Sequence, residues 1–199
     1  MKLIEHFIGG KNYSGNSGRK NKIFNPATGE QSAEVKLATS EDVNKAVENA
    51  KNSFEMWSNT PPLQRARIMF KFKELIEKNS DELTKIIVSE HGKVYEDAKG
   101  SLVRGLEVVE YACGIPQMLK GEFTENVGKN VDSWSIRQPL GVCAGITPFN
   151  FPAMVPMWMF PMAIACGNTF VLKPSEKDPS CANLLAQMFS EAGLPDGVL

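Results

Sequence analysis

The chain has 199 residues, and its 22 Lys and Arg residues nearly balance its 23 Asp and Glu residues, which gives a net charge of −1. A hydrophobic content of 42% with 23% charged residues is typical of a folded globular protein and excludes an intrinsically disordered chain. The near-neutral charge excludes the basic surface that nucleic-acid binding requires, so we expect no nucleic-acid partner.

Short strands are predicted for the first part of the chain. Strand-like segments lie around Gly9, Gly15 and Gly18, and residues 25–29, Asn-Pro-Ala-Thr-Gly, are typical of a turn between two strands.

Four helices are predicted to follow. We expect Ser40 to cap the first, Pro61-Pro62 to begin the second, and Ser80 and Gly92 to bound the third. The fourth is predicted for residues 95–119, and residues 122–137 are then expected to be extended. Helical spacing predicts that these apolar residues are buried: Val43, Ala46, Val47, Ala50, Phe54, Trp57, Leu63, Ala66, Met69, Phe70, Ile76, Leu83, Ile86, Ile87, Leu102, Leu106, Val109 and Ala112.

Charge nearly disappears from the last third of the chain. Only six charged side chains follow Arg137, and none lies between Gln138 and Leu172. A membrane span and a segment buried in an α/β core are the two alternatives. Prolines at four positions between residues 148 and 161 interrupt the apolar run. We therefore favour the buried segment and expect no membrane partner.

This last third is predicted to form a strand, a helix, a strand and a helix. Residues 140–146 and 169–172 are typical of parallel strands buried on both faces. Helices are expected at residues 153–166 and from Asp178 to Gly193, and residues 194–199 are typical of a turn into a third strand. Because two parallel strands leave an open sheet edge, we expect the chain to be the N-terminal piece of a longer α/β protein.

The four cysteines have no metal-ligand spacing, and the chain has only two histidines. We therefore expect free thiols, no bound metal, and a reducing, cytoplasmic location.

Two peptides are predicted to follow the carboxyl ends of the parallel strands, where α/β sheets bind ligands. The first, residues 147–152, holds Asn150 between two prolines. The Asn150 amide could stabilise a developing oxyanion or satisfy the loop backbone. The second holds Lys173 and Glu176, which could bind a dinucleotide ribose or form a surface ion pair. The sequence contains neither a G-x-G-x-x-G motif nor a P-loop.

Three motifs in this order resemble the N-terminal part of the aldehyde dehydrogenase superfamily. They are residues 25–30, Asn-Pro-Ala-Thr-Gly-Glu, residues 148–152, Pro-Phe-Asn-Phe-Pro, and residues 167–176, Gly-Asn-Thr-Phe-Val-Leu-Lys-Pro-Ser-Glu. Residues 103–112, 139–146 and 150–162 are most similar to the CoA-acylating methylmalonate-semialdehyde dehydrogenase branch. The resemblance spans essentially the whole chain.

The resemblance implies a cofactor site for NAD. Thr147 and Phe149 would line the cofactor cleft. Lys173 and Glu176 would bind the adenosine ribose, with Lys177 beside them at a position where most members of the branch carry Arg.

The resemblance also implies how the substrate is held. Asn150 would be the oxyanion donor, and Arg104 would bind the substrate carboxylate, to which a guanidinium fits in a bidentate manner. Without the resemblance, Arg104 would be taken as a solvated residue on a helix flank.

The fold that the resemblance implies is the N-terminal part of an α/β enzyme. Residues 1–121 would hold the strands and helices of an NAD-binding domain, and residues 122–138 an oligomerisation hairpin. Residues 139–199 would hold the first βαβα unit of a Rossmann-like sheet, and the catalytic domain would be absent. The hairpin implies a homotetramer built as a dimer of dimers.

The activity implied is the NAD-dependent, CoA-acylating oxidation of methylmalonate or malonate semialdehyde to propionyl-CoA or acetyl-CoA, in valine and thymine or inositol catabolism. None of the four cysteines matches the nucleophile of the family, so this chain alone is expected to be inactive. Two alternatives remain open, a non-acylating aldehyde dehydrogenase and a stand-alone, non-catalytic nucleotide-binding module.

Overall fold

The N-terminal strands form two small sheets. The computed structural model describes residues 2–199. Strands β1 (Lys2–Ile4), β5 (Gln31–Lys36) and β4 (Lys20–Phe24) form one sheet in that order, and β2 (His6–Ile8) pairs with β3 (Lys11–Tyr13) in the other. The predicted turn between β4 and β5 is confirmed, because the backbone N–H of Asn25 donates to Glu30 O at 2.9 Å.

The four predicted helices are present, with differences at their ends. They are α1 (Ser40–Ser58), α2 (Pro62–Lys78), α3 (Ser80–His91) and α4 (Tyr95–Cys113), and Gly114 separates α4 from the short α5 (Ile115–Met118). The prediction that Ser40 caps α1 is wrong. Thr39 is the cap, because its hydroxyl accepts the N–H of Asp42 at 3.2 Å while the Asp42 carboxylate accepts the N–H of Thr39 at 2.8 Å.

The ends of α3 follow the sequence prediction in part. Asn79, rather than Ser80, is the N-cap residue, so that prediction is also wrong by one position. Gly92 ends the helix as predicted, in the left-handed conformation with φ +84°.

Most of the predicted buried stripe is confirmed, but four of its members are exposed. Val43, Val47, Leu63 and Phe70 have exposed fractions of 50%, 38%, 60% and 53%. The two valines of α1 line an open cavity instead of a packed core. On α2, the buried aromatic side chain is Phe72, whose ring lies 4.2 Å from that of Phe189 and 5.9 Å from that of Phe160.

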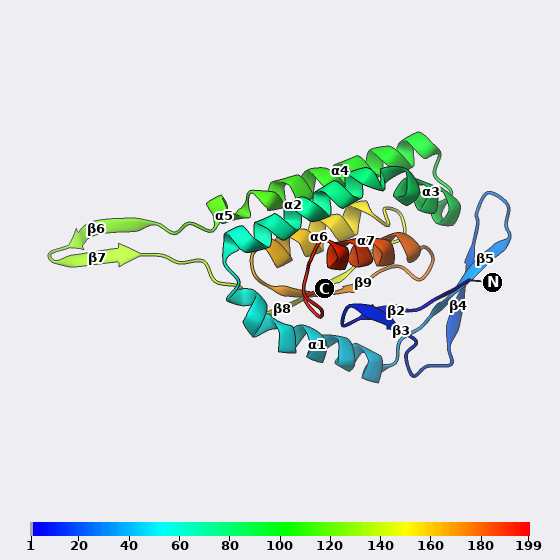
Figure 1. Ribbon diagram of the computed structural model, residues 1–199, viewed down its shortest axis with the longest axis horizontal. Helices are drawn as coiled ribbons and strands as arrows, with labels where there is room; N and C mark the ends of the chain where they lie inside the picture. The colour runs from blue at the N-terminus through cyan, green and yellow to red at the C-terminus, as the bar shows by residue number, and fades with distance from the viewer. Residues whose placement is uncertain (1) are drawn as a thin grey trace.

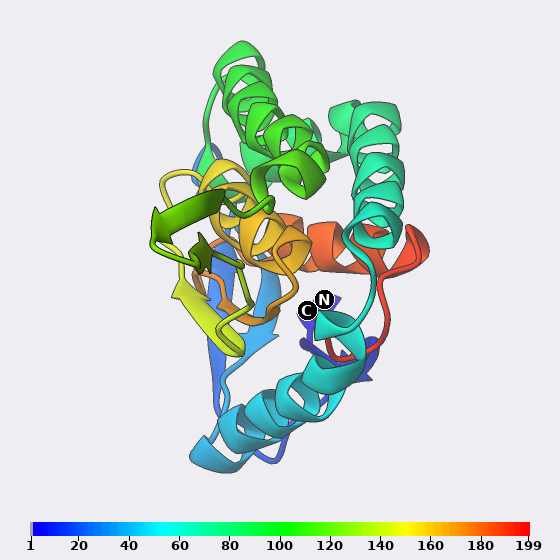
Figure 2. The same cartoon turned by 90° about the vertical axis from the view of Figure 1, so that its left-hand side faces the viewer.

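The last third of the chain forms a small parallel sheet with helices on both faces. Strand β8 (Val142–Ile146) pairs in parallel with β9 (Thr169–Lys173), and α6 (Met154–Ala165) connects them. Figure 1 shows α1 below this sheet and α6, α7 (Ser180–Glu191), α2 and α4 above it, and Figure 2 shows the same order of layers. The predicted α/β class is therefore confirmed.

Strand β8 is not buried on both faces, which corrects the sequence prediction. Val142 is 38% exposed and Ile146 is 77% exposed, since both line the cavity beside the sheet. On the other side of β9, the backbone N–H of Phe170 donates to Val198 O at 2.8 Å, so the end of the chain runs beside that strand.

A hairpin projects as an arm from these layers (Figure 1). It consists of β6 (Phe123–Gly128) and β7 (Val131–Trp134), which pair in an antiparallel manner within the segment predicted to be extended. Its large apolar side chains are exposed, among them Phe123 at 66% and Trp134 at 67%.

All four cysteines are free thiols, as the sequence predicted. Within residues 2–199, no helix combines the length and the apolar character needed to cross a lipid bilayer.

Candidate functional site

The two peptides predicted to carry the site lie at one edge of the parallel sheet. Strands β8 and β9 run in register from Val142 opposite Thr169 to Ile146 opposite Lys173. One further bond, from the Thr147 N–H to Lys173 O at 3.1 Å, continues the ladder into the loops. The carboxyl ends of both strands therefore bring residues 147–153 and residues 174–179 together.

Asn150 presents a free side-chain amide in the first loop. The residue is exposed, and in the described part of the chain its amide group has no hydrogen-bond partner. Its backbone carbonyl instead accepts a hydrogen bond from Lys93 Nζ at 2.5 Å. Because the side chain does not satisfy the loop backbone, it is available to donate to a ligand.

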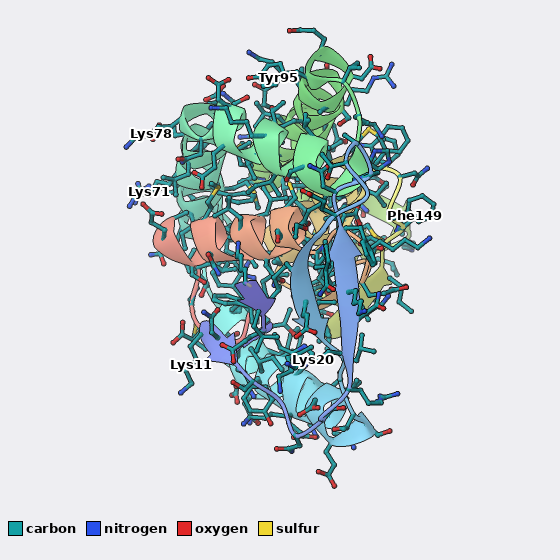
Figure 3. All side chains as sticks on the ribbon, turned by 90° about the vertical axis from the view of Figure 1, so that its right-hand side faces the viewer. Lys11, Lys20, Lys71, Lys78, Tyr95 and Phe149 are labelled. Carbon is teal, nitrogen blue, oxygen red and sulfur yellow. The ribbon has the colours of Figure 1, made fainter. Side chains whose placement is uncertain are left out.

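Phe149 lies between a histidine and a lysine. Its ring is 48% exposed and stacks on the His91 ring with centroids 6.5 Å apart, while Lys177 Nζ lies 4.3 Å from the Phe149 centroid. The structure thus places Lys177 over the Phe149 ring. Figure 3 shows Phe149 at the outer edge of the molecule. Thr147, two residues earlier, is buried.

Lys173 and Glu176 are brought together at the end of β9. Lys173 Nζ lies 3.3 Å from Glu176 Oε2, and both side chains are about half exposed. Hydrogen bonds from its own backbone N–H and from Lys173 lower the pKa of Glu176 below its ordinary value, so it is a carboxylate at neutral pH. The pair offers a donor and an acceptor side by side, which suits a ribose diol.

A cavity of about 490 Å³ opens beside this edge. It is bounded by β8, β9, α1 and α7, and its wall is largely apolar, with Lys173 and Glu176 among the lining residues. Its volume lies within the range of small-molecule sites. Thr147, Phe149, Asn150, Lys177 and Arg104 lie outside its lining.

Arg104 lies on α4, beside the helix that follows the Asn150 loop. Its backbone carbonyl accepts a hydrogen bond from Trp158 Nε1 of α6 at 3.4 Å. The next residue, Gly105, allows the close approach of the two helices, because a Cβ there would lie 3.2 Å from Met154 Cα. The guanidinium is exposed and, in residues 2–199, has no ion-pair or hydrogen-bond partner, so it is free to bind an anion.

Two acids next to these loops, the buried Asp178 and the half-buried Glu90, were not predicted as site residues. Asp178 is 2% exposed, and burial raises its pKa to about 7, with a further contribution from Glu90. Burial also raises the pKa of Glu90, whose Oε2 accepts the N–H of Ser180 at 3.1 Å. The sequence Asp178-Pro179-Ser180 indicated only a helix start, and nothing in it shows that Asp178 faces inward.

Burial disfavours the thiolate form of three of the four cysteines. Burial raises the pKa of Cys113 to about 11 and also raises the pKa values of Cys166 and Cys181. A nucleophilic thiol requires the opposite shift.

The chain is similar to known proteins over its whole length. The model of the aldehyde dehydrogenase family matches residues 13–199. The chain is 55% identical over 199 residues to the malonate-semialdehyde dehydrogenase of Pseudomonas aeruginosa. The match covers 100% of this chain and 40% of that protein. It is 53% identical over 196 residues to the acylating, mitochondrial methylmalonate-semialdehyde dehydrogenase of Arabidopsis thaliana, with 98% of this chain and 32% of that protein covered.

A solved structure agrees with these relatives. A candidate methylmalonate-semialdehyde dehydrogenase from Sinorhizobium meliloti, complexed with NAD, superposes with a TM-score of 0.98 at 55% identity. The match covers 100% of this chain and 40% of that one. The chain therefore spans well under half the length of the relatives that it matches.

Proposed function

The chain belongs to the aldehyde dehydrogenase family, and from that membership we propose that it supplies the oxyanion donor, the carboxylate anchor and part of the NAD site of a CoA-acylating semialdehyde dehydrogenase. One observation carries the proposal. The Asn150 amide lies at the carboxyl edge of the parallel sheet, in the loop that leads into α6, and α6 packs against the helix that carries Arg104. Neither side chain has a hydrogen-bond or ion-pair partner among residues 2–199. A donor for a carbonyl oxygen and a cation for a carboxylate suit a substrate that has both groups.

The proposed cofactor is NAD, which accepts a hydride from the substrate when it is bound. The Lys173–Glu176 pair at the cavity edge would hold the adenosine ribose. Thr147 and Phe149, in the adjoining loop outside the cavity lining, would border the cofactor cleft, with Lys177 over the Phe149 ring. Glu176 is a carboxylate at neutral pH and would repel the 2′-phosphate of NADP. The complex of the Sinorhizobium meliloti relative with NAD supports this choice.

The proposed net reaction converts methylmalonate semialdehyde, CoA and NAD into propionyl-CoA, CO2 and NADH; malonate semialdehyde would give acetyl-CoA. The aldehyde carbon is oxidised and becomes the thioester carbonyl, and the carboxylate of the substrate leaves as CO2. Asn150 would donate to the oxygen of the attacked carbonyl, and Arg104 would hold the carboxylate by a bidentate contact. The name of the Arabidopsis thaliana relative includes the word acylating, which supports an acyl-transfer step; CoA is the acceptor that we propose. A role in valine, thymine or inositol catabolism would follow from these substrates.

Residues 1–199 are not expected to turn over substrate by themselves. Burial raises the pKa values of three of the four cysteines, and within residues 2–199 the Cys143 thiol of β8 has no hydrogen-bond partner. Thiolate attack on the aldehyde would therefore use a cysteine from polypeptide outside these residues.

The projecting hairpin is proposed to be an oligomerisation arm of a homotetramer. Exposed Phe123 and Trp134 on paired strands would be covered by another subunit. Sedimentation velocity of the Trp134→Ser variant tests this proposal. The variant is expected to form smaller assemblies than those of the parent at the same concentration.

The main proposal is tested by Asn150→Ala in the full-length polypeptide that carries this chain. Loss of one oxyanion donor is expected to lower kcat for semialdehyde oxidation by about 10²–10³-fold, with the KM for NAD nearly unchanged. A matched control is Asn59→Ala, since Asn59 caps the end of α1 away from the sheet edge. Unchanged kcat in Asn150→Ala would exclude the oxyanion role.

A further inference from the structure

Lys93 reaches from the end of α3 into the loop that carries Asn150. Its Nζ donates to the backbone carbonyl of Asn150 at 2.5 Å and lies 4.2 Å from the centroid of the Phe151 ring. These contacts join residues 57 positions apart in the sequence. One lysine therefore makes a hydrogen bond to the carbonyl of Asn150 and a cation–π contact with the ring of the next residue, Phe151.

The backbone before Lys93 directs the side chain to this position. Gly92 ends α3 with φ +84°, and a Cβ at that position would lie 2.9 Å from Pro26 Cγ. Both the conformation and the close approach require glycine. Lys93 therefore directly follows a helix end whose conformation and close packing on Pro26 allow only glycine at residue 92.

Lys93 is also attracted to the second loop of the site. Burial lowers the pKa of Lys93, while the charges of Asp178 and Asp97 oppose that change. Asp178 follows Lys177 in the loop after β9, and neither of its buried carboxylate oxygens has a hydrogen-bond partner of ordinary geometry within residues 2–199. The other groups that face Lys93 are His91, with Nε2 3.4 Å from Nζ, and the Phe151 ring.

We propose that Lys93 is a positioning residue that holds the loop of residues 147–152 so that the Asn150 amide points at the carbonyl of the substrate. The hydrogen bond to the Asn150 carbonyl prevents rotation of the peptide that carries this side chain. The inference rests on the oxyanion role proposed for Asn150. Displacement of a catalytic group by about 1 Å can reduce a rate about 10²-fold, so a loop released from Lys93 would lose much of the benefit of its amide.

The test compares Lys93→Met with Lys93→Arg in the full-length polypeptide that carries this chain. Lys99→Met is the matched control, because Lys99 also lies over an aromatic ring, at 5.9 Å from the Tyr95 centroid, and within 3.8 Å of an acid, Asp81. We expect Lys93→Met to lower kcat by about 10- to 100-fold with the KM for NAD within about twofold of the parent. Lys93→Arg retains a charged donor and is expected to recover part of the loss.

A double-mutant cycle separates positioning from a general structural role. If Lys93 acts through Asn150, Lys93→Met in the Asn150→Ala background lowers kcat by less than about threefold. An equal loss in both backgrounds, an equal loss in Lys99→Met, or unchanged kcat in Lys93→Met overturns the inference. Unchanged kcat in Asn150→Ala overturns the oxyanion proposal and this inference with it. A loss of kcat in Asn150→Ala together with unchanged kcat in Lys93→Met overturns this inference alone, so the two failures are distinguishable.

Amide hydrogen exchange provides a second readout that does not depend on turnover. Exchange of the Thr147 and Val155 N–H groups, which donate to Lys173 O and Phe151 O at the two ends of this loop, is expected to be at least about tenfold faster in Lys93→Met than in the parent, while Lys99→Met keeps the parent rate. Equal protection of this loop in Lys93→Met and the parent also overturns the inference.

Discussion

Replacing Asp178 by Asn is expected to change how the free energy of unfolding depends on pH. Asp178 is 2% exposed, and burial is the main reason that its pKa rises from the ordinary value of 3.8 to about 7. Glu90 adds to this rise, while Ser175, Lys93 and Lys177 oppose it. The native state therefore holds a proton on Asp178 over a pH range in which the unfolded chain has lost it.

The sign of the effect follows from the numbers of bound protons. Between about pH 4 and pH 7 the native state binds more protons than the unfolded state, so the free energy of unfolding falls as the pH rises. A difference of about three pKa units corresponds to a loss of at most about 4 kcal/mol from the free energy of unfolding. This loss is complete above pH 7. Asn has nearly the same shape and no charge, so Asp178→Asn removes this loss of stability.

The assay is urea unfolding followed by far-UV circular dichroism at pH 4.5 and pH 8. The variant and the parent are expected to be nearly equal in stability at pH 4.5, and the variant is expected to be the more stable at pH 8. Glu90, whose pKa burial also raises, retains part of the slope in the variant. Asp97→Asn, a change at an exposed acid that also faces Lys93, is the control. A parent and an Asp178→Asn variant with the same pH slope would refute the reasoning.

Three further substitutions test the caps, the core and the cofactor choice. Thr39→Ala is expected to lower the free energy of unfolding by about 1 kcal/mol in urea titrations, while Ser40→Ala changes it little, because Thr39 makes the cap. Phe189→Ala, which removes a ring packed between Phe72 and Phe160, is expected to cost about 3–5 kcal/mol in the same assay. Glu176→Gln is expected to weaken discrimination against NADP, measured as the ratio of kcat/KM values for NAD and NADP in the full-length polypeptide; an unchanged ratio would exclude its role.

The sequence was sufficient to predict the elements whose signals are local. These elements depend on residues that lie close together in the chain. They are the turn with Asn25 and Gly29 between two strands, the end of α3 at Gly92, and the apolar strands β8 and β9. Periodicity also identified most of the core. The cap of α1 was misplaced because Ser40 and Thr39 are both good capping residues, and only the backbone of Thr39 has the extended conformation of a cap.

The other errors, and the features that were not predicted, depend on distant partners. Val43 and Ile146 have apolar side chains in regular patterns, yet they line a cavity between α1 and the sheet instead of a packed core. The contact of Lys93 with the Asn150 carbonyl joins two segments whose proximity depends on how α3 packs beside the sheet edge. Likewise, Asp178 reads as the start of a helix, and its burial is a property of the folded chain.

The central claim is that this chain supplies the site for a semialdehyde that carries a carboxylate, and Arg104→Leu in the full-length polypeptide tests it most directly. The measurement is kcat/KM for malonate semialdehyde and for propanal, with Arg67→Leu on the exposed face of α2 as the control. We expect Arg104→Leu to lower kcat/KM for the semialdehyde by about 10–100-fold, mostly through KM, and to change the value for propanal by less than about threefold. Equal losses for the two substrates would contradict the assignment of Arg104 as the carboxylate anchor.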